Sequence, residues 1–255
     1  MLIEMILIIF FILNKGKQKM NNQEIIYTPQ FKKWFGDWQN SKNCSKVLDD
    51  NGFPLIVHHG TNNEFNEFKS DYMGKTGTAL GQGFYFTSNQ DEARGYGENI
   101  KSFYLNIRKP LNAKKLTMKR NNIAILVDMI DKKQSEKDPE FGYGILSDFG
   151  DVDYEGRNKV LRNAVDLLMD EENDVDLVGG LINMSDDYDL VVDVLRNSLG
   201  YDGIISRERG VYVVHHPNQV KEINNNVFDS NKNNFNESVK KIKITESQFN
   251  FLLKH

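Results

Sequence analysis

Cysteine is almost missing from this 255-residue sequence, which holds a single one at Cys44. One cysteine excludes a disulfide within the chain and any zinc site built from several thiolates. A lone cysteine in a chain of mixed charge is typical of proteins from a reducing compartment. We therefore expect a cytoplasmic protein, and we expect no metal.

A strong excess of charge of one sign is missing too. The 32 Lys and Arg residues against 36 Asp and Glu residues give a formal net charge of −4. Such a chain has no global field that attracts nucleic acid, so a nucleic-acid partner has no support from charge. The stretch "GQG" at 81–83 is too short for a dinucleotide-binding GxGxxG, and the sequence contains no P-loop.

No apolar run is long enough for a membrane span. The most apolar stretch, "MLIEMILIIFFIL" at 1–13, is shorter than the roughly 20 residues that cross a bilayer. A signal peptide would begin with positive charge, whereas the early charge here is Glu4. Three interpretations stay open: translation from Met20, an uncleaved short anchor that attaches the chain to a membrane, and a signal peptide. Residues 1–19 are therefore set apart from the fold.

The chain as a whole has the apolar content for a sizeable core, with 39% hydrophobic residues and 16 Phe. Period-two alternation and flanking glycines predict strands, and apolar residues at i, i+3 and i+4 predict helices. The predicted strands occupy a hairpin over 45–60 and the segments 81–89, 100–113 (closed by Pro110), 202–207 and 210–223. Helices are predicted over 27–43, after 89 with Asn89 or Asp91 as cap, and in a block over about 117–199. This order predicts an α+β fold with a helical insertion, without regular βαβ alternation.

The last part of the chain is expected to stand apart. The segment 224–238 is rich in Asn and is predicted to be a polar linker with little to bury. A capping box from Thr245 to Gln248 predicts a final helix. We therefore expect a folded domain over 20–223, followed by a linker and a C-terminal helix over 224–255.

Three segments place polar residues and glycines at the ends or middles of predicted strands. They are "HHGT" at 58–61, the stretch 81–96 and the stretch 201–221. Glycine at such places lets a ligand approach the backbone. Singly, each segment is weak: a histidine like His59 is typical of a turn, and tyrosines between phenylalanines are typical of a core. The pair at 215–216 could join 58–59 in a metal site, but a strand end before a turn is the favoured interpretation.

Together the three segments resemble the ADP-ribosyltransferase fold of the diphtheria-toxin and poly(ADP-ribose) polymerase branch. The signature of that branch is a His-Tyr-Glu triad on three strands. "HGT" at 59–61 is similar to its HG[ST] motif, and "GQGFYF" at 81–86 is similar to its GxGxYF strand, with the triad tyrosine at Tyr85. A second family tyrosine follows eleven residues later, which here is Tyr96.

The closest resemblance is to the ADP-ribosyltransferase modules of phage and mobile-element polyvalent proteins. The motifs that carry it are "FGDW", "VHHGT", "GQGFYFT", "GDVDYEGR", "DGII" and "VYVVHHPNQVK". The resemblance covers about residues 27 to 223, nearly all of the expected folded domain.

The resemblance implies that NAD is the substrate. The Gly60 backbone would hydrogen-bond the nicotinamide amide, and Tyr85 and Tyr96 would sandwich the nicotinamide ring. His59, joined by Thr61, would contact the adenosine ribose. Holding both halves of NAD exposes the anomeric carbon to attack. The expected NAD-binding residues are His59, Gly60, Thr61, Gly83, Tyr85 and Tyr96.

The other histidines are expected outside this site. His58 precedes the expected ribose contact His59, and we expect it to face the other side of the strand. The resemblance implies that the pair at 215–216 faces away from the nicotinamide pocket.

The triad carboxylate is where the sequence departs from the family pattern. Aligning "YVV" on 212–214 places Val211 where the resemblance leads one to expect glutamate. Three interpretations stay open: a single transfer assisted by a substrate carboxylate, replacement by Glu208 in "SRERG", and loss of catalysis with retained nicotinamide or ADP-ribose binding. Ala93 stands where family members often carry a serine that bonds the amide. The candidate catalytic residues are His59, Tyr85 and Glu208.

The resemblance thus implies an enzyme, an NAD-dependent mono-ADP-ribosyltransferase that modifies a macromolecular acceptor. We expect that acceptor to be a host protein and the enzyme to be a phage or mobile-element effector in the bacterial cytoplasm. Two alternatives are kept: an inactive module that binds NAD, ADP-ribose or a partner, and an NAD glycohydrolase. The absent glutamate argues against chain elongation, which needs an activated ribose hydroxyl.

Overall fold

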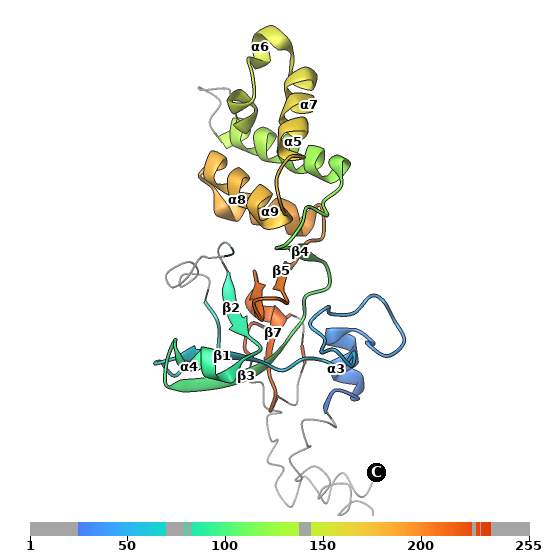
Figure 1. The fold of residues 1–255 in the computed structure, drawn as a ribbon, viewed down its shortest axis with the longest axis vertical. Helices are drawn as coiled ribbons and strands as arrows, with labels where there is room; N and C mark the ends of the chain where they lie inside the picture. The colour runs from blue at the N-terminus through green and yellow to red at the C-terminus, as the bar shows by residue number, and fades with distance from the viewer. Residues whose placement is uncertain are drawn as a thin grey trace, which may run out of the picture.

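The computed structural model describes residues 25–69, 80, 83–137, 144–225, 228–229 and 231–235. The expected N-terminal segment 1–19 and the expected C-terminal helix lie outside these residues. Within the described parts, no helix is long and apolar enough to cross a membrane. The molecule is elongated, with a β-sheet toward one end and a group of helices at the other (Figure 1).

One seven-stranded sheet forms the base of the fold. Its strands are β1 (Val57–Thr61), β2 (Phe84–Thr87), β3 (Asn99–Leu105), β4 (Pro110–Asn112), β5 (Gly203–Ser206), β6 (Val211–Val214) and β7 (Val220–Glu222). Their order across the sheet is β4-β5-β6-β2-β1-β3-β7. All neighbours are antiparallel except β4 and β5, which are parallel.

The sheet splits between β1 and β2. Strand β1 pairs with β3 at every residue from Val57 to Thr61, but its pairing with β2 is limited to His58 opposite Thr87. Past His58 the two strands separate. The split therefore lies at the "HGT" end of β1, beside the "GFYF" strand.

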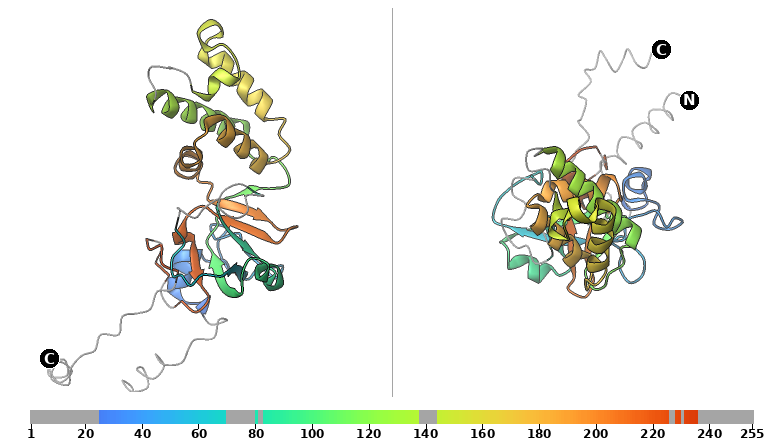
Figure 2. Two further views of the ribbon diagram at one scale, coloured as in Figure 1. Left: turned by 90° about the vertical axis from the view of Figure 1, so that its left-hand side faces the viewer. Right: turned by 90° about the horizontal axis from the view of Figure 1, so that it is seen from above.

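Helices account for the rest of the regular structure. They are α3 (Pro29–Phe35), α4 (Gln90–Arg94), α5 (Arg120–Lys137), η2 (Ile145–Asp148), α6 (Val152–Glu155), α7 (Arg157–Leu168), α8 (Asp174–Ser185), α9 (Tyr188–Asn197) and η3 (Pro217–Gln219). The helices predicted between about 117 and 199 are present as α5 to α9, which we call the helical block. Figures 1 and 2 show this block stacked on the sheet, with α8 and α9 nearest to it.

Period-two alternation gives the central strands two different faces. One face, here the helical face, carries Tyr85 of β2 and Val211 and Val213 of β6, which pack with residues of the helical block. The other face carries Phe84 and Phe86 of β2, which pack in a separate cluster with residues of β3 and β7. The two hydrophobic cores therefore lie on opposite sides of the same sheet.

Helix α3 closes the N-terminal side of the fold. The Thr28 side chain accepts a hydrogen bond from the Phe31 amide at 3.2 Å, and Pro29 occupies the first turn, where its missing N–H costs nothing. Phe31, Trp34 and Phe35 are buried as their helical spacing predicted. This confirms an amphipathic helix at this place, but the helix ends at Phe35 and is shorter than the predicted 27–43.

Three predictions about segment limits are wrong. Pro110 does not close a long strand; it begins β4, where it pairs with Gly203 in parallel register. The stretch predicted as one strand over 210–223 is two, β6 and β7, interrupted by η3. Between β6 and β7 the interruption is at Pro217, the first residue of η3. The second strand of the predicted hairpin over 45–60 is present as β1, but the pairing between the two halves is reduced to an isolated bridge between Leu48 and Pro54.

The Asn-rich segment after β7 was predicted to bury little, and this too is wrong. Phe228 is 6% exposed and packs on α3, with its ring centroid 5.1 Å from that of Phe31. Phe235 is 1% exposed and lies 5.1 Å from Phe103 of β3, centroid to centroid. Phe228 and Phe235 thus anchor this segment to the fold, although most of its residues are polar.

Candidate functional site

His59 lies on β1 at the split, with its ring in an aromatic cluster. Its Nδ1 lies 2.8 Å from the backbone oxygen of Tyr85, so the histidine bridges the two strands where their backbones separate. The rings of Phe65, Phe68 and Phe86 surround it, with centroids 6.0, 5.1 and 5.6 Å away. Burial lowers the pKa of His59, opposed by its hydrogen bond to Tyr85. At neutral pH this imidazole is therefore uncharged.

His58 faces the opposite side of the same strand. Its Nδ1 lies 2.9 Å from the Ser102 hydroxyl on β3. The prediction that the two histidines diverge is confirmed, and strand alternation is the reason.

Gly60 is pressed against helix α4. A Cβ added there would lie 1.8 Å from the backbone oxygen of Ala93, and one added at Gly97 would lie 2.2 Å from the backbone carbon of Thr61. Only glycine lets α4 and the following turn approach β1 this closely. The hydroxyl of Thr61 accepts a hydrogen bond from the Asn63 amide at 3.1 Å, which shapes the next turn.

Tyr85 occupies the helical face of β2. Its hydroxyl accepts a hydrogen bond from the Leu80 amide at 3.0 Å, and its ring packs beside the helical-block core. The pKa of Tyr85 is raised, chiefly by burial and less by the nearby Tyr96. Tyr96 follows α4 and is 72% exposed, so its ring is open to a ligand.

Gly83 has a packing role that the sequence did not reveal. Its φ of +153° disfavours any side chain, and a Cβ there would lie 2.3 Å from Val213 Cγ1 of β6. Glycine at this position therefore lets β6 pack against the beginning of β2.

Val211 stands on the face that carries Tyr85. It pairs with Thr87 across the β2–β6 ladder, and it packs against the same core as Tyr85. A valine there contributes only apolar surface.

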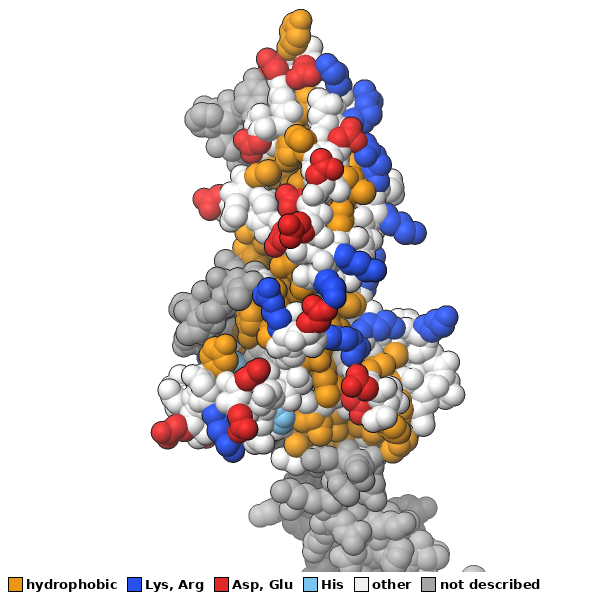
Figure 3. Space-filling view, in the orientation of Figure 1, with side chains coloured by type: hydrophobic (Ala, Val, Ile, Leu, Met, Phe, Trp, Pro, Cys, Tyr) orange, Lys and Arg blue, Asp and Glu red, His pale blue; other side chains and the backbone are white. Residues whose placement is uncertain are grey.

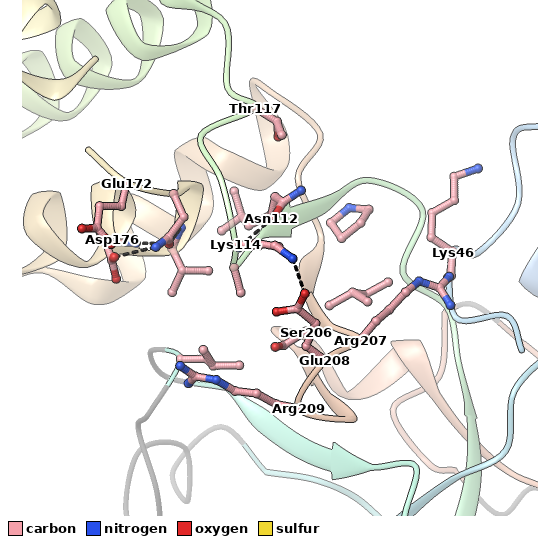
Figure 4. A pocket seen from close by; sticks show the side chains of 17 residues that line it. Lys46, Asn112, Lys114, Thr117, Glu172, Asp176, Ser206, Arg207, Glu208 and Arg209 are labelled. Carbon is pink, nitrogen blue, oxygen red and sulfur yellow. Dashed lines mark hydrogen bonds and ion pairs between the residues drawn. The ribbon is translucent and has the colours of Figure 1, made fainter. Parts of the chain in front are cut away.

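Glu208 lies in the loop between β5 and β6, at a cavity of about 690 Å³. It forms an ion pair with Lys114, and its side chain is 68% exposed. Charged side chains line the cavity (Figure 4); they are Lys46, Lys114, Glu172, Asp176, Arg207, Glu208 and Arg209. Figure 3 shows Lys and Arg side chains gathered at this level, between the helices and the sheet. His59 and Tyr85 do not line this cavity, so Glu208 is not brought together with them here.

His215 packs toward the helical block, while the expectation that the pair at 215–216 faces away from the nicotinamide pocket stays a prediction. His215 continues the alternation of Val211 and Val213 and is buried at 8% exposure. Its Nδ1 lies 3.3 Å from the hydroxyl of Tyr188, the first residue of α9. Counting strand residues in twos from Val211 could have placed it. Within the described residues, no group of three or more His, Cys, Asp or Glu side chains is arranged to hold a metal.

Glu92 is a residue that sequence reasoning missed. It lies in the first turn of α4, where its Oε2 accepts a hydrogen bond of 2.7 Å from the Thr87 hydroxyl. The signal was present in the spacing, because Glu92 is three residues after the cap Asn89, a position where glutamate commonly folds back. The structure confirms Asn89 as the cap, accepting from the Asp91 amide at 2.9 Å.

The α+β fold is that of an ADP-ribosyltransferase-type domain, and sequence comparison agrees. Residues 49–230 match the family described as ADP-ribosyltransferase in polyvalent proteins. The chain belongs to this family, whose members use NAD as substrate.

Comparison with individual proteins adds little. No curated protein matches the chain. A solved structure described as the crystal structure of an anti-CRISPR protein is 12% identical, with a TM-score of 0.24. That alignment covers 63% of this chain and 89% of the other. A likeness this low carries no argument about this chain.

Proposed function

We propose that the chain is an NAD-dependent mono-ADP-ribosyltransferase that modifies a macromolecular acceptor, most simply a host protein. The observation that carries the proposal is the position of Tyr85 beside the split. Continuing the register from His58 and Thr87 by two residues places Gly60 across from Tyr85, where the strands are no longer paired. Gly60 and Tyr85 then face each other where β1 and β2 are not paired. This gap between the strands suits the flat amide group of nicotinamide.

The reaction assigned to this site breaks the bond between ribose C1′ and the nicotinamide nitrogen. Nicotinamide leaves with the bonding electron pair, a nucleophilic atom of the acceptor bonds to C1′, and the acceptor proton passes to a base. Gly60 would orient the amide, and Tyr85 with Tyr96 would enclose the ring. The transition state resembles an oxocarbenium ion, so a nearby carboxylate lowers its energy.

His59 and Thr61 would contact the adenosine ribose. Because burial lowers the pKa of His59, its ring is a neutral hydrogen-bonding group. It therefore does not attract the negatively charged diphosphate of NAD. Its second nitrogen, Nε2, is the atom available to a ribose hydroxyl when Nδ1 bonds the Tyr85 carbonyl.

A single transfer fits the site better than chain growth. Elongation requires the hydroxyl of a bound ribose to be activated as a nucleophile, and Val211 supplies neither charge nor a hydrogen bond for that purpose. We also propose that the protein acts as a phage or mobile-element effector in the bacterial cytoplasm, as members carrying these motifs would.

The decisive experiment is incubation with labelled NAD and host lysate. We expect a labelled macromolecule with wild type, and at least a 100-fold loss with Tyr85→Ala, on the order of the loss caused by removing a transition-state contact. Tyr154→Ala is the matched control, because Tyr154 is 88% exposed at the far end of the helical block. If wild type neither transfers label nor releases nicotinamide, the proposed activity is contradicted.

One observation favours a second candidate, a binding module without catalysis. Val211 leaves the β6 position of the expected glutamate apolar. That module would bind NAD or ADP-ribose in calorimetry without releasing nicotinamide. Release of nicotinamide without labelled acceptor would instead identify an NAD glycohydrolase that uses the same residues.

A further inference from the structure

We propose that Glu92 of helix α4 supplies the catalytic carboxylate that β6 lacks. This inference rests on the proposed function and names the group that completes its site. It differs from the three interpretations that the sequence left open, one of which gave that role to Glu208.

The first argument is position. Thr87 pairs directly with Val211, and directly opposed residues of an antiparallel pair have Cβ atoms about 4.5–5.5 Å apart. The Thr87 hydroxyl donates to Glu92 Oε2 at 2.7 Å. The Glu92 carboxylate is thus one hydrogen bond away from the side chain that stands opposite Val211. It approaches that place from α4 instead of from β6.

The second argument is that Glu92 lies among the residues of the NAD site. In the chain, Glu92 comes after the end of β2, which carries Tyr85, and after the cap of α4. Tyr96 follows Glu92 at the spacing of about one helical turn. Its neighbour Ala93 is buried against Gly60, whose added Cβ would meet the Ala93 oxygen at 1.8 Å. The turn that carries Glu92 therefore packs on the glycine of the expected amide contact.

The third argument is that this turn is held in place. Asn89 Oδ1 accepts from the amides of Asp91 and Glu92 at 2.9 and 3.5 Å, and the Asn89 amide donates to the Thr87 hydroxyl oxygen at 3.0 Å. A group fixed before the substrate arrives loses little entropy in the transition state. Thr87 thereby acts as a positioning residue for Glu92.

The fourth argument is charge. Within the described chain Glu92 forms no ion pair, whereas the only neighbouring cation of its helix, Arg94, pairs with Asp91 at 3.0 Å. Glu208 is bound to Lys114, which reduces the negative charge that it could offer. An unpaired carboxylate stabilises the positive charge that develops at C1′ and can take the proton of the acceptor as the new bond forms.

The test compares Glu92→Gln with Asp91→Asn and Glu208→Gln, measuring kcat and KM for nicotinamide release and NAD binding by calorimetry. The glutamine of the first variant keeps an oxygen for Thr87 and has the same length, so circular dichroism and Tm should match wild type. We expect Glu92→Gln to lower kcat by about 100-fold or more with little change in KM or NAD affinity. The control Asp91→Asn should retain wild-type kcat, and Glu208→Gln tests the competing assignment, in which the loss of kcat falls on Glu208 instead.

A rescue variant separates catalysis from structure. Adding Val211→Glu to Glu92→Gln returns a carboxylate to the opposite strand, and we expect it to recover at least 10-fold of the lost kcat. Wild-type rates in Glu92→Gln, or a loss confined to Glu208→Gln, would overturn the role of Glu92 while leaving the proposed function intact. Wild type that binds NAD without turnover would overturn it as well. Wild type that does not bind NAD would overturn the proposed function itself.

Discussion

At the scale of one residue, burial determines the protonation of the histidines in this protein. His59 is enclosed by phenylalanine rings, and burial is the largest cause of its lowered pKa. Burial also lowers the pKa of His58 and of His216. All three therefore favour the neutral form in the folded protein, and for His59 this keeps positive charge out of the space expected for NAD.

These shifts predict that the protein loses stability in mild acid. A histidine whose folded pKa lies below its unfolded value of about 6.5 takes up its proton more readily when unfolded. Stability is then full above about pH 6.5 and falls as the pH drops below it. We expect Tm to fall from about pH 7.5 to about pH 5, and to fall less in His59→Asn. Parallel Tm curves for the two proteins would contradict the assignment to His59.

At the scale of elements, a single carboxylate joins the helical block to the sheet. Asp174, the first residue of α8, is fully buried. Its oxygens accept from the amides of Asn112, Thr117 and Met118 at 2.9, 2.7 and 2.8 Å, and from the Thr117 hydroxyl at 2.6 Å. The strand β4, the start of α5 and the start of α8 therefore meet at one side chain. The cavity beside Glu208 lies at the same junction.

Removing this side chain should weaken the junction strongly. Asp174→Ala leaves several buried donors without an acceptor, so we expect a loss of about 3 kcal/mol or more in the free energy of unfolding. Urea denaturation followed by circular dichroism measures it, with Asp170→Ala as an exposed control in the preceding loop. Equal midpoints for the two variants would show that the hydrogen bonds contribute little.

At the scale of the whole molecule, a segment late in the chain packs against earlier parts of the fold through Phe228 and Phe235. The amide of Phe235 donates to the Asn66 oxygen at 3.2 Å, and the Phe235 oxygen accepts from the Glu222 amide at 3.0 Å. Lys221 is fully buried, and its Nζ donates to the Asn234 oxygen at 2.8 Å. Late residues thus cover the core under β1 and β3, on the face opposite to Tyr85.

Removing the ring of Phe235 should destabilise the entire fold. We expect Phe235→Ala to lower the free energy of unfolding by about 3–5 kcal/mol, the usual cost of removing a buried phenylalanine ring. Phe53→Ala is the control, since Phe53 is 42% exposed. A change below about 1 kcal/mol, the size expected at a surface position, would show that the tail contributes little.

Part of this architecture was predictable because it depends on local patterns. Apolar spacing predicted the helical block, and Asn89 and the glycines beside "FYF" indicated where elements begin. Motif spacing also led to His59 and Tyr85, which the fold brings into hydrogen-bond contact. Local patterns predicted these features because a helix or strand must bury one face whatever its partner is.

The remaining features were decided by contacts between distant segments. Sequence alone determined the family and the strand that carries Tyr85, and it showed that Val211 is not a carboxylate. Only the tertiary structure placed Thr87 opposite Val211 and turned Glu92 toward it, and only there does His215 meet Tyr188. The physical reason is that strand register and helix docking join residues far apart in the chain. A linear motif records which residues are present, but not which side of the sheet supplies the charge.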